Sequence, residues 1–513
     1  MRSQTRQVGR RTQAAPGPER QMVVWVVALF VYALIAWALL TRITLPSPLH
    51  LVVLIMAAGI LVVTALRIEW GVFGLALILP FSRPGFTIGE LGEFHISGFN
   101  VALIGVFLAY GLRYFLDDSF AARGPFIRRT KVDAVLLILG GLLVFSTLAA
   151  FNMNETALQR TYLGLAIKKH VLLIMWFYLV VSVLKTPSDL RGFVTMFAVA
   201  GVTASFFGVA ERLAGGGAQI TAGTQSEQLA AGAGGRLGGG WFGLNHPNMF
   251  GGLLLLTLPF WFFMVNSLKR TWRRLLTEIA VVTGFLGLLF TYSRSAWIGA
   301  LAGLGLVGLA DRRSLQRLII FGIVFAVIAQ GAVFFTTGRS LIDVIISRFE
   351  QLEESAFSSR PHIYASAGAV VAAHPWLGVG LGTFRYHAPP TATGFVPQHA
   401  HNVFYHYAAE AGVPAAAALT AFILVLAYLA KRNLRIVGKS SEYAFLALGS
   451  AAALIGIVAQ MMVVQVLHQE ILAFAIFTAA AVIVALDRMA DEGHFDASHS
   501  AAPEHTAGPR IRG

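Results

Sequence analysis

The chain has 513 residues, of which 56% are hydrophobic and only 12% charged, and it contains no cysteine. A soluble globular domain carries about 25% charged residues, so the composition predicts an integral membrane protein, and the lack of cysteine excludes disulfides, thiolate metal sites and cysteine nucleophiles. The net charge of +14 does not imply nucleic-acid binding here, because basic residues beside membrane spans set orientation and meet anionic lipid headgroups.

Polar segments are found at both ends of the sequence. Residues 1–21 are basic and polar, and a full-length apolar segment follows them without a small-residue cleavage site. This pattern predicts a retained membrane anchor rather than a cleaved signal peptide. We expect residues 1–21 and 488–513 to form disordered cytoplasmic tails.

The apolar runs predict an all-α polytopic membrane protein with 12–14 transmembrane helices, at about 20 residues per crossing. The third and tenth runs are short enough to be tilted or re-entrant. The expected spans are 22–41, 49–66, 69–82, 96–114, 132–150, 169–185, 190–210, 247–266, 275–292, 295–310, 316–336, 414–430, 443–465 and 471–487. They divide the chain into N-terminal spans (22–210), a Gly-rich outer loop (211–246), spans 247–336, a large outer loop (337–413) and C-terminal spans (414–487).

The distribution of basic residues predicts the orientation of these spans. With the amino terminus inside, the inner segments hold 27 and the outer segments 12 of the 39 Lys and Arg residues. The positive-inside rule therefore places both termini in the cytoplasm and the 337–413 loop outside. The expected spans hold almost no ionisable residue at membrane depth, which disfavours an ion-coupled transporter.

Two arginines on the predicted outer side are candidates for binding an anion. Arg294 lies between two apolar segments with no room for a long loop, where a guanidinium either snorkels beside interface aromatics or meets an anion. Arg360 follows two serines and precedes Pro361, which favours a helix start. A cation there is unfavourable unless an anion is bound, although a solvated loop arginine is the alternative. Residues 361–373 have the spacing of an amphipathic helix.

Histidines and glycines follow in the same loop. Gly378, Gly380 and Gly382 have no preceding strand and no P-loop lysine, so they predict a tight turn rather than a nucleotide site. His399 and His401 precede a helix-like run that ends at Gly412. An exposed imidazole can accept a proton from a hydroxyl; the alternatives are a structural histidine and a metal ligand, for which the neighbourhood supplies no third partner.

One histidine outside this loop has two interpretations. His246 occurs in Asn245-His246-Pro247-Asn248, directly before an expected span. It either stabilises the junction between loop and helix, which is the favoured interpretation, or lines the same outer cavity.

Three motifs together resemble the O-antigen ligase and polymerase superfamily of membrane enzymes. They are Ser293-Arg294-Ser295-Ala296-Trp297, then His374-Pro375 with the run Gly378 to Phe384, and His399-Ala400-His401-Asn402 leading to Glu410-Ala411-Gly412. The ligase pattern of His-Asn, nine residues and Gly-x-x-Gly is met at His401, Asn402 and Gly412. It departs at Ala415, where a glycine is expected, and this weakens ligase relative to polymerase.

The resemblance implies glycan transfer from undecaprenyl diphosphate at the outer face of the bacterial inner membrane, by inversion and without a metal or other cofactor. The implied partners are a lipid-linked glycan donor, an acceptor that is either lipid A-core or a lipid-linked repeat unit, and membrane lipids, but no nucleic acid. Arg294 and Arg360 map onto the family's essential arginines and His401 onto its essential histidine, the expected base. His399, His246, Asn402 and Glu410 are the expected substrate-binding residues. A lipid-linked glycan flippase and a non-catalytic membrane scaffold are the alternatives from other classes.

Overall fold

The computed structural model describes residues 48–81, 97–122, 124–151, 156–213, 237, 246–268, 271–310, 312–351, 360–391, 394–438 and 442–495. The expected span 22–41, the expected tail 1–21, residues 496–513 of the expected C-terminal tail and nearly all of the Gly-rich segment 214–245 lie outside these residues. Residues 488–491, expected to begin that tail, are helical. Every regular element in the described part is a helix. The all-α prediction is therefore confirmed.

The helices before the Gly-rich segment are α2 (Pro48–Leu66), α3 (Ile68–Ile78), α4 (Gly98–Leu116), α5 (Asp118–Ala121), α6 (Asp133–Ala150), α7 (Ala157–Val183) and α8 (Pro187–Leu213). After it come α10 (Pro247–Met264), α11 (Trp272–Phe290), α12 (Arg294–Ala310), α13 (Arg312–Thr337), α14 (Leu341–Gln351), α15 (Arg360–Ala373), α16 (Phe384–His387), α17 (Val403–Ala411), α18 (Val413–Ile436), α19 (Ala444–Met461) and α20 (Glu470–Asp491). Short 3-10 turns lie at Leu79–Phe81 (η1), Val265–Ser267 (η5) and Val466–His468 (η7).

Apolar length identifies the membrane-spanning helices. Within the described residues, 9 helices are long and apolar enough to cross a bilayer, and three shorter apolar helices lie within α2, α3 and α12. The remaining long helix, α11, carries Arg273, Arg274 and Glu278 in its first two turns. Each expected span from residue 49 onward corresponds to one helix, because uninterrupted apolar runs of this length must satisfy their backbone groups internally in lipid.

Helix α7 corrects one expected boundary. The apolar run predicts a span that starts at 169, with the preceding residues in an outer loop, whereas α7 starts at Ala157 and its candidate span at Gln159. Thr156 caps it in a capping box with Gln159, which sets the helix start well before the apolar run. Lys168, Lys169 and His170 therefore all lie inside one helix.

Close helix packing at the centre of the bundle depends on glycine. Helix α19 packs against both α10 and α12. A Cβ at Gly299 or Gly303 of α12 would lie 2.6 Å from the carbonyl oxygen of Gly456 or 2.3 Å from that of Ala452 on α19. Small residues allow such backbone contact between membrane helices, where van der Waals packing replaces the hydrophobic effect. Helix α13 is the contrast, with only 11% of its span buried, as expected of a lipid-facing helix.

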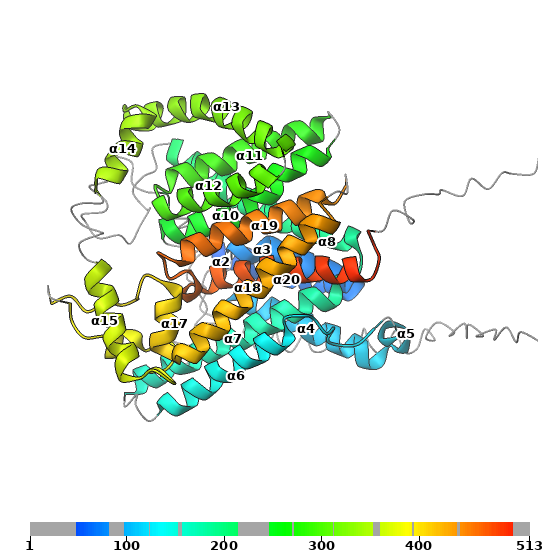
Figure 1. Cartoon of the computed structure of the whole chain (residues 1–513). Helices are drawn as coiled ribbons and strands as arrows, with labels where there is room; N and C mark the ends of the chain where they lie inside the picture. The colour runs from blue at the N-terminus through cyan, green and yellow to red at the C-terminus, as the bar shows by residue number, and fades with distance from the viewer. Residues whose placement is uncertain are drawn as a thin grey trace, which may run out of the picture.

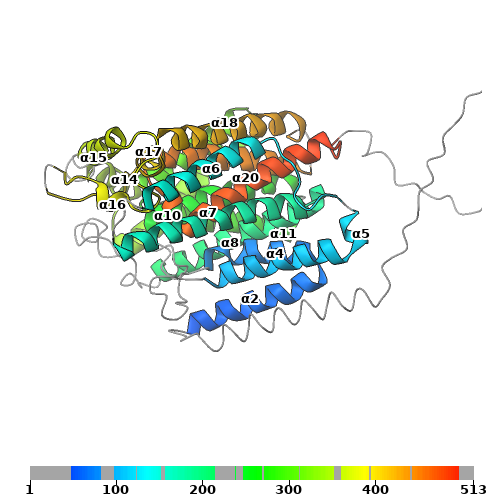
Figure 2. The same ribbon diagram turned by 90° about the horizontal axis from the view of Figure 1, so that it is seen from below.

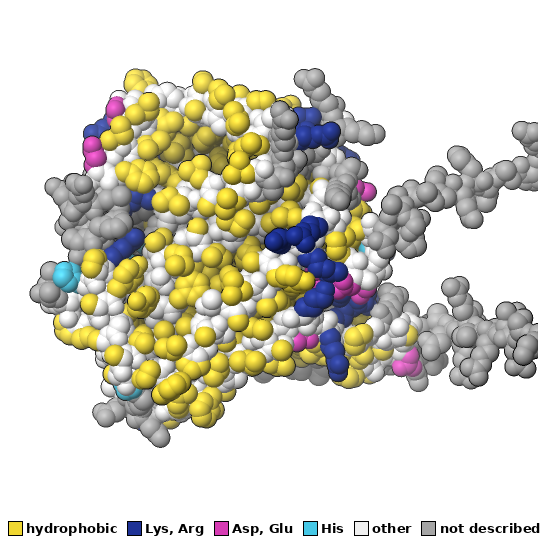
Figure 3. All heavy atoms as spheres, in the orientation of Figure 1, with side chains coloured by type: hydrophobic (Ala, Val, Ile, Leu, Met, Phe, Trp, Pro, Cys, Tyr) yellow, Lys and Arg dark blue, Asp and Glu magenta, His cyan; other side chains and the backbone are white. Residues whose placement is uncertain are grey.

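The two ends of the bundle differ in their chemistry. The short helices α14 to α17 gather at one end, whereas α5 and the end of α20 lie at the other (Figures 1 and 2). Near the α20 end, Lys131 Nζ lies 2.8 Å from Asp487 and 2.7 Å from Asp491, and Arg432 pairs with the same two carboxylates. Figure 3 shows Lys and Arg gathered toward that end of an otherwise mostly apolar face.

Candidate functional site

The glycine-punctuated turn after α15 is built against the end of α17. Val379 N–H donates to the Ala409 carbonyl (3.0 Å) and Gly380 N–H to that of Glu410 (2.8 Å). Gly378 has φ +63, and a Cβ there would lie 2.3 Å from the Glu410 carbonyl carbon. Only glycine accommodates both this φ and this approach. The predicted tight turn is confirmed, and it holds α17 in place.

Glu410 is the carboxylate that this turn surrounds. It is 6% exposed, accepts a hydrogen bond from Phe384 N–H (3.2 Å) and lies 3.3 Å from His406 Nε2. Burial alone would raise the pKa of this carboxyl, but the adjoining His406 imidazole and the N–H groups of Gly382 and Phe384 lower its pKa to about 2. Glu410 is therefore a fixed negative charge at neutral pH.

Asn402 fixes the start of α17 and hence the position of His401. Its Oδ1 accepts from the N–H groups of Phe404 (2.9 Å) and Tyr405 (3.1 Å), and its Nδ2 donates to the Met462 carbonyl at the end of α19 (2.9 Å). His401, directly before it, is exposed and has φ 51. A left-handed conformation is uncommon for a residue other than glycine, and it concentrates at functional sites.

His399 lies in a different environment from His401. Its ring centroid is 4.1 Å from that of His468 and 5.8 Å from that of His406. Burial, together with the positive charge of the neighbouring histidines and Arg385, lowers the pKa of His399 to about 2. A ring this reluctant to take a proton is a poor general base.

The turn before Arg294 is tied to the same end of α19. Tyr292 has φ 48, Ser293 Oγ donates to Asn248 Oδ1 (2.8 Å), and Gln460 Nε2 donates to the Asn248 carbonyl (2.7 Å). Arg294 then starts α12. Asn248, which bonds Ser293 beside Arg294, and Asn402 beside His401 thus both bond to the three residues from Gln460 to Met462 at the end of α19.

Arg360 is carried to the same end by α15. Helix α15 starts at Arg360, one residue before the predicted start, and buries Ile363, Ala367 and Val370 on one face. It packs on α17, where the rings of Tyr364 and Tyr405 stack with centroids 5.7 Å apart. Tyr364 lies four residues after Arg360, and Tyr405 lies four residues after His401. The stacked tyrosines therefore join the two segments that carry these candidate catalytic residues.

His246 has the structural role that the sequence favours. It is the N-cap of α10, and its Nδ1 accepts from Asn248 N–H (3.1 Å). A capping side chain satisfies one of the unpaired N–H groups at a helix start. Its expected contact with substrate remains a prediction.

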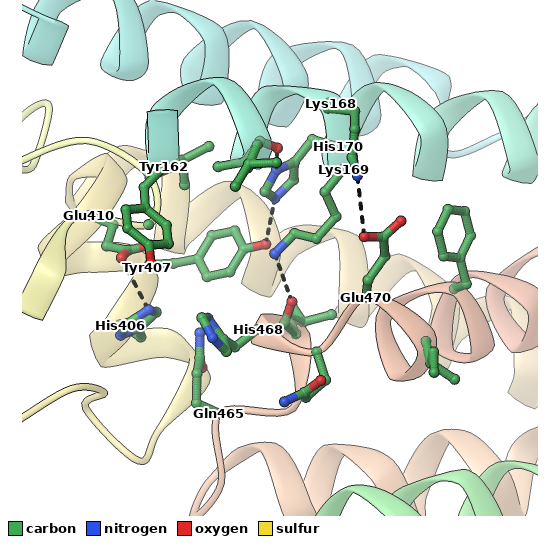
Figure 4. A pocket seen from close by; sticks show the side chains of 18 of the residues that line it. Tyr162, Lys168, Lys169, His170, His406, Tyr407, Glu410, Gln465, His468 and Glu470 are labelled. Atoms are coloured by element: carbon green, nitrogen blue, oxygen red, sulfur yellow. Dashed lines mark hydrogen bonds and ion pairs between the residues drawn. The ribbon is translucent and has the colours of Figure 1, made fainter. Parts of the chain in front are cut away.

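A cavity of about 240 Å³, lined by both polar and apolar side chains, opens beside these elements. We name it the α7–α20 cavity; its walls come from the start of α4, from α7, from α17 and from the segment 465–474, and they include Glu410 and His406 but not Arg294, Arg360 or His401. Figure 4 shows Lys168, Lys169 and His170 pointing from α7 toward α17 and α20. His170 Nε2 lies 3.0 Å from Tyr407 Oη, Lys169 donates to the Leu467 carbonyl (3.0 Å), and Lys168 lies 3.6 Å from Glu470.

Several of these wall residues are absent from the sequence-based prediction. Lys168 was expected in a loop and Lys169 and His170 at the start of a span, although a basic pair within a capped helix was a readable signal. His406 lies one turn before Glu410 on α17, and the i, i+4 spacing would have linked the two. His468 gives no comparable signal, because only the fold brings it beside His399. Among the described residues, no group of His, Cys, Asp and Glu side chains has the arrangement of a metal site.

The fold and this site together define a polytopic membrane protein with a site that carries arginine, lysine and histidine side chains at one end of its helix bundle. Residues 279–420 match the family model described as O-antigen ligase, so this segment is similar to that family. The matched segment contains Arg294, Arg360, His401 and Glu410. No curated protein matches the chain significantly.

Proposed function

We propose that the chain transfers a glycan from undecaprenyl diphosphate to a hydroxyl of an acceptor sugar at the outer face of the bacterial inner membrane. The match of residues 279–420 to the O-antigen ligase model supports glycan transfer of the ligase or polymerase type. The finer proposal is supported by the backbone conformation at two positions. Within the described residues, the non-glycine residues with positive φ are His401 and Tyr292, which lies in the turn before Arg294. Strain of this kind costs about 1–3 kcal/mol per residue and accumulates where function requires it.

The proposed chemistry is a single displacement with inversion. His401 removes the proton from the acceptor hydroxyl, whose oxygen then attacks the anomeric carbon of the donor glycan. The bond from that carbon to the diphosphate oxygen breaks, and its electron pair leaves with the diphosphate. Arg294 and Arg360 stabilise the charge that develops there through bidentate, charge-assisted hydrogen bonds.

The His401→Ala variant distinguishes a transferase from a flippase, the alternative function. The test uses full-length protein in nanodiscs, with the lipid-linked glycan that accumulates in cells deleted for the gene as donor. We expect His401→Ala to lose glycan transfer yet still bind undecaprenyl diphosphate, measured as a rise in unfolding temperature. Arg294→Ala should lower the transfer rate about 10²- to 10³-fold, whereas Arg339→Ala, an exposed arginine after α13, should transfer normally. Transfer that survives in His401→Ala contradicts the proposed base.

Deletion of the gene also distinguishes the two members of the superfamily. A ligase moves a finished chain, whereas a polymerase joins repeat units on the carrier. Long carrier-linked chains in the deletion strain therefore indicate a ligase, and single repeats indicate a polymerase. The size of the accumulated lipid-linked glycan is the measurement.

A further inference from the structure

Two buried amide oxygens in the α7–α20 cavity have no hydrogen-bond partner. Asn100 is 2% exposed and Gln465 is 4% exposed, both line the cavity, and neither Asn100 Oδ1 nor Gln465 Oε1 has a partner. Nδ2 of Asn100 donates to Glu470 (2.7 Å), which fixes the amide with its oxygen unpaired. Buried acceptors without donors are rare and costly. Both would be satisfied by a ligand that brings hydroxyl groups.

The rest of the cavity wall offers aromatic rings for the apolar face of a sugar and a lysine donor for its oxygens. The rings of Phe99, Tyr162 and Tyr407 line the same cavity, and the Arg385 guanidinium, 4.2 Å from the Tyr162 ring centroid, braces that ring. Lys169 adds a donor for ring or hydroxyl oxygens. The volume of about 240 Å³ is below the roughly 300 Å³ at which pockets for drug-sized ligands begin. A single sugar ring with a few waters matches this combination of size, aromatic surface and hydrogen-bonding groups.

The position of the cavity relative to the turn that carries Arg294, here called the arginine side, indicates whether the sugar belongs to the donor or to the acceptor. Along the segment from α19 to α20, Gln460 bonds to Asn248, which accepts from Ser293 of the Arg294 turn. Met462 bonds to Asn402, and Gln465 lines the cavity. Along this segment, the residue that contacts Asn402, next to His401, therefore lies between the residue tied to the arginine turn and the residue that lines the cavity. His399 packs on His468 of the cavity wall, so the cavity begins beside the segment that carries His401. A displacement reaction needs the leaving group and the attacking hydroxyl on opposite sides of the reacting carbon.

We propose that the α7–α20 cavity binds the acceptor: one pyranose ring of the acceptor glycan, recognised through hydroxyl donors to Asn100 Oδ1 and Gln465 Oε1. This assignment rests on the proposed transferase function. It makes Asn100 and Gln465 specificity-determining residues for the acceptor and leaves diphosphate binding to the arginine side.

Removing each unpaired oxygen tests the proposal. Asn100→Leu and Gln465→Met keep the side-chain size, so each should raise the apparent acceptor KM about fivefold to tenfold, as expected for one lost hydrogen bond, with kcat and undecaprenyl diphosphate binding little changed. The acceptor is the glycolipid fraction of the deletion strain from which the lipid-linked glycan used as donor has been removed by chromatography, titrated against a fixed concentration of that donor. Asn433→Leu is the matched control, because Asn433 is 0% exposed and its Oδ1 is also unpaired, but it lies outside the cavity. An acceptor KM that both cavity variants leave at the wild-type value overturns the proposal.

A cysteine in the cavity wall reports occupancy directly. The chain has no cysteine, so Gln469→Cys, at a half-buried wall position, is the only site that a maleimide can label. We expect the acceptor fraction to slow labelling at least threefold and undecaprenyl diphosphate to leave it unchanged. Protection by undecaprenyl diphosphate instead would assign the cavity to the donor and overturn the proposal.

The two proposals fail in different ways. If the wild-type protein transfers glycan but the cavity variants and the labelling show no response to acceptor, the acceptor site is wrong and the transferase stands. If His401→Ala transfers as well as the wild type, the proposed chemistry is wrong whatever the cavity binds.

Discussion

His399 and His401 are separated by one alanine and differ in almost every property that matters for proton transfer. His401 is exposed and held in a left-handed conformation, whereas His399 is packed among other histidines with its Nδ1 buried and without a hydrogen-bond partner. The sequence could not separate the two, because both precede the same helix. The fold separates them, because the left-handed residue turns the chain between the packed ring and the Asn402 cap.

The packed ring of His399 predicts a pH-dependent stability. The unfolded chain protonates this histidine below about pH 6.5, but the folded protein, in which burial lowers the pKa of His399 to about 2, does not. The unfolding free energy contributed by this site is therefore complete above pH 6.5 and is lost as the pH falls below it, by up to about 1.4 kcal/mol per pH unit.

Thermal or denaturant unfolding in detergent from pH 7 to pH 5 measures this effect. His399→Gln should make the loss of stability with acid shallower by about that slope. His362→Gln, at an exposed position on α15, should leave the slope unchanged. Equal slopes in the wild type and His399→Gln would show that the ring is protonated in the folded state.

At the scale of elements, the α17 helix is fixed at both ends by the residues of the motifs. Asn402 caps its start and ties it to α19. At its end, Gly412 has φ +86, and a Cβ there would lie 2.1 Å from the Trp376 carbonyl oxygen. The spacing between the His-Asn pair and this glycine is therefore the length of a short helix clamped between two fixed contacts. That length sets the distance from His401 to Glu410.

Substitution of Gly378 tests whether this clamp depends on close packing. Gly378→Ala should destabilise the protein by more than the roughly 1–3 kcal/mol of a strained left-handed residue, because its Cβ would also meet the Glu410 backbone at 2.3 Å. Transfer should fall as α17 shifts. Gly394→Ala is the control, since Gly394 has φ +78 but nothing within 4 Å of the added Cβ. The two unfolding free energies measure the packing contribution, and equal losses would contradict it.

The sequence predicts the helices well and the cavity poorly, for physical reasons. A long apolar run has few alternatives in a membrane, so each expected span in the described chain is a helix. The start of α7 was missed because Lys168 and Lys169 interrupt the apolar run, although helical hydrogen bonding continues through them. The cavity was missed because its walls come from α4, α7, α17 and α20, and no local pattern records that Asn100 and Gln465 face one space. Glu410 was expected because a motif names it.

At the scale of the whole molecule, the bundle is polarised along its length. The ion pairs of Lys131 and Arg432 lie at one end, and the candidate site with α15 and α17 lies at the other. Basic residues are retained on the cytoplasmic side of membrane proteins. The Lys131 end is therefore expected in the cytoplasm, and the α7–α20 cavity on the outer side, where the proposed function requires the lipid-linked glycan.

Single cysteines in this naturally cysteine-free chain test the orientation. Gln398→Cys and Arg435→Cys place exposed thiols at the two ends, one beside His399 and one in the last turn of α18. In intact cells with a permeabilised outer membrane, a membrane-impermeant maleimide should label Gln398→Cys within minutes and Arg435→Cys only after lysis, because the charged reagent does not cross the inner membrane. The reverse pattern would place His401 in the cytoplasm, where the proposed acceptor and donor do not meet, and the outer-face assignment would have to be abandoned even if transfer were observed.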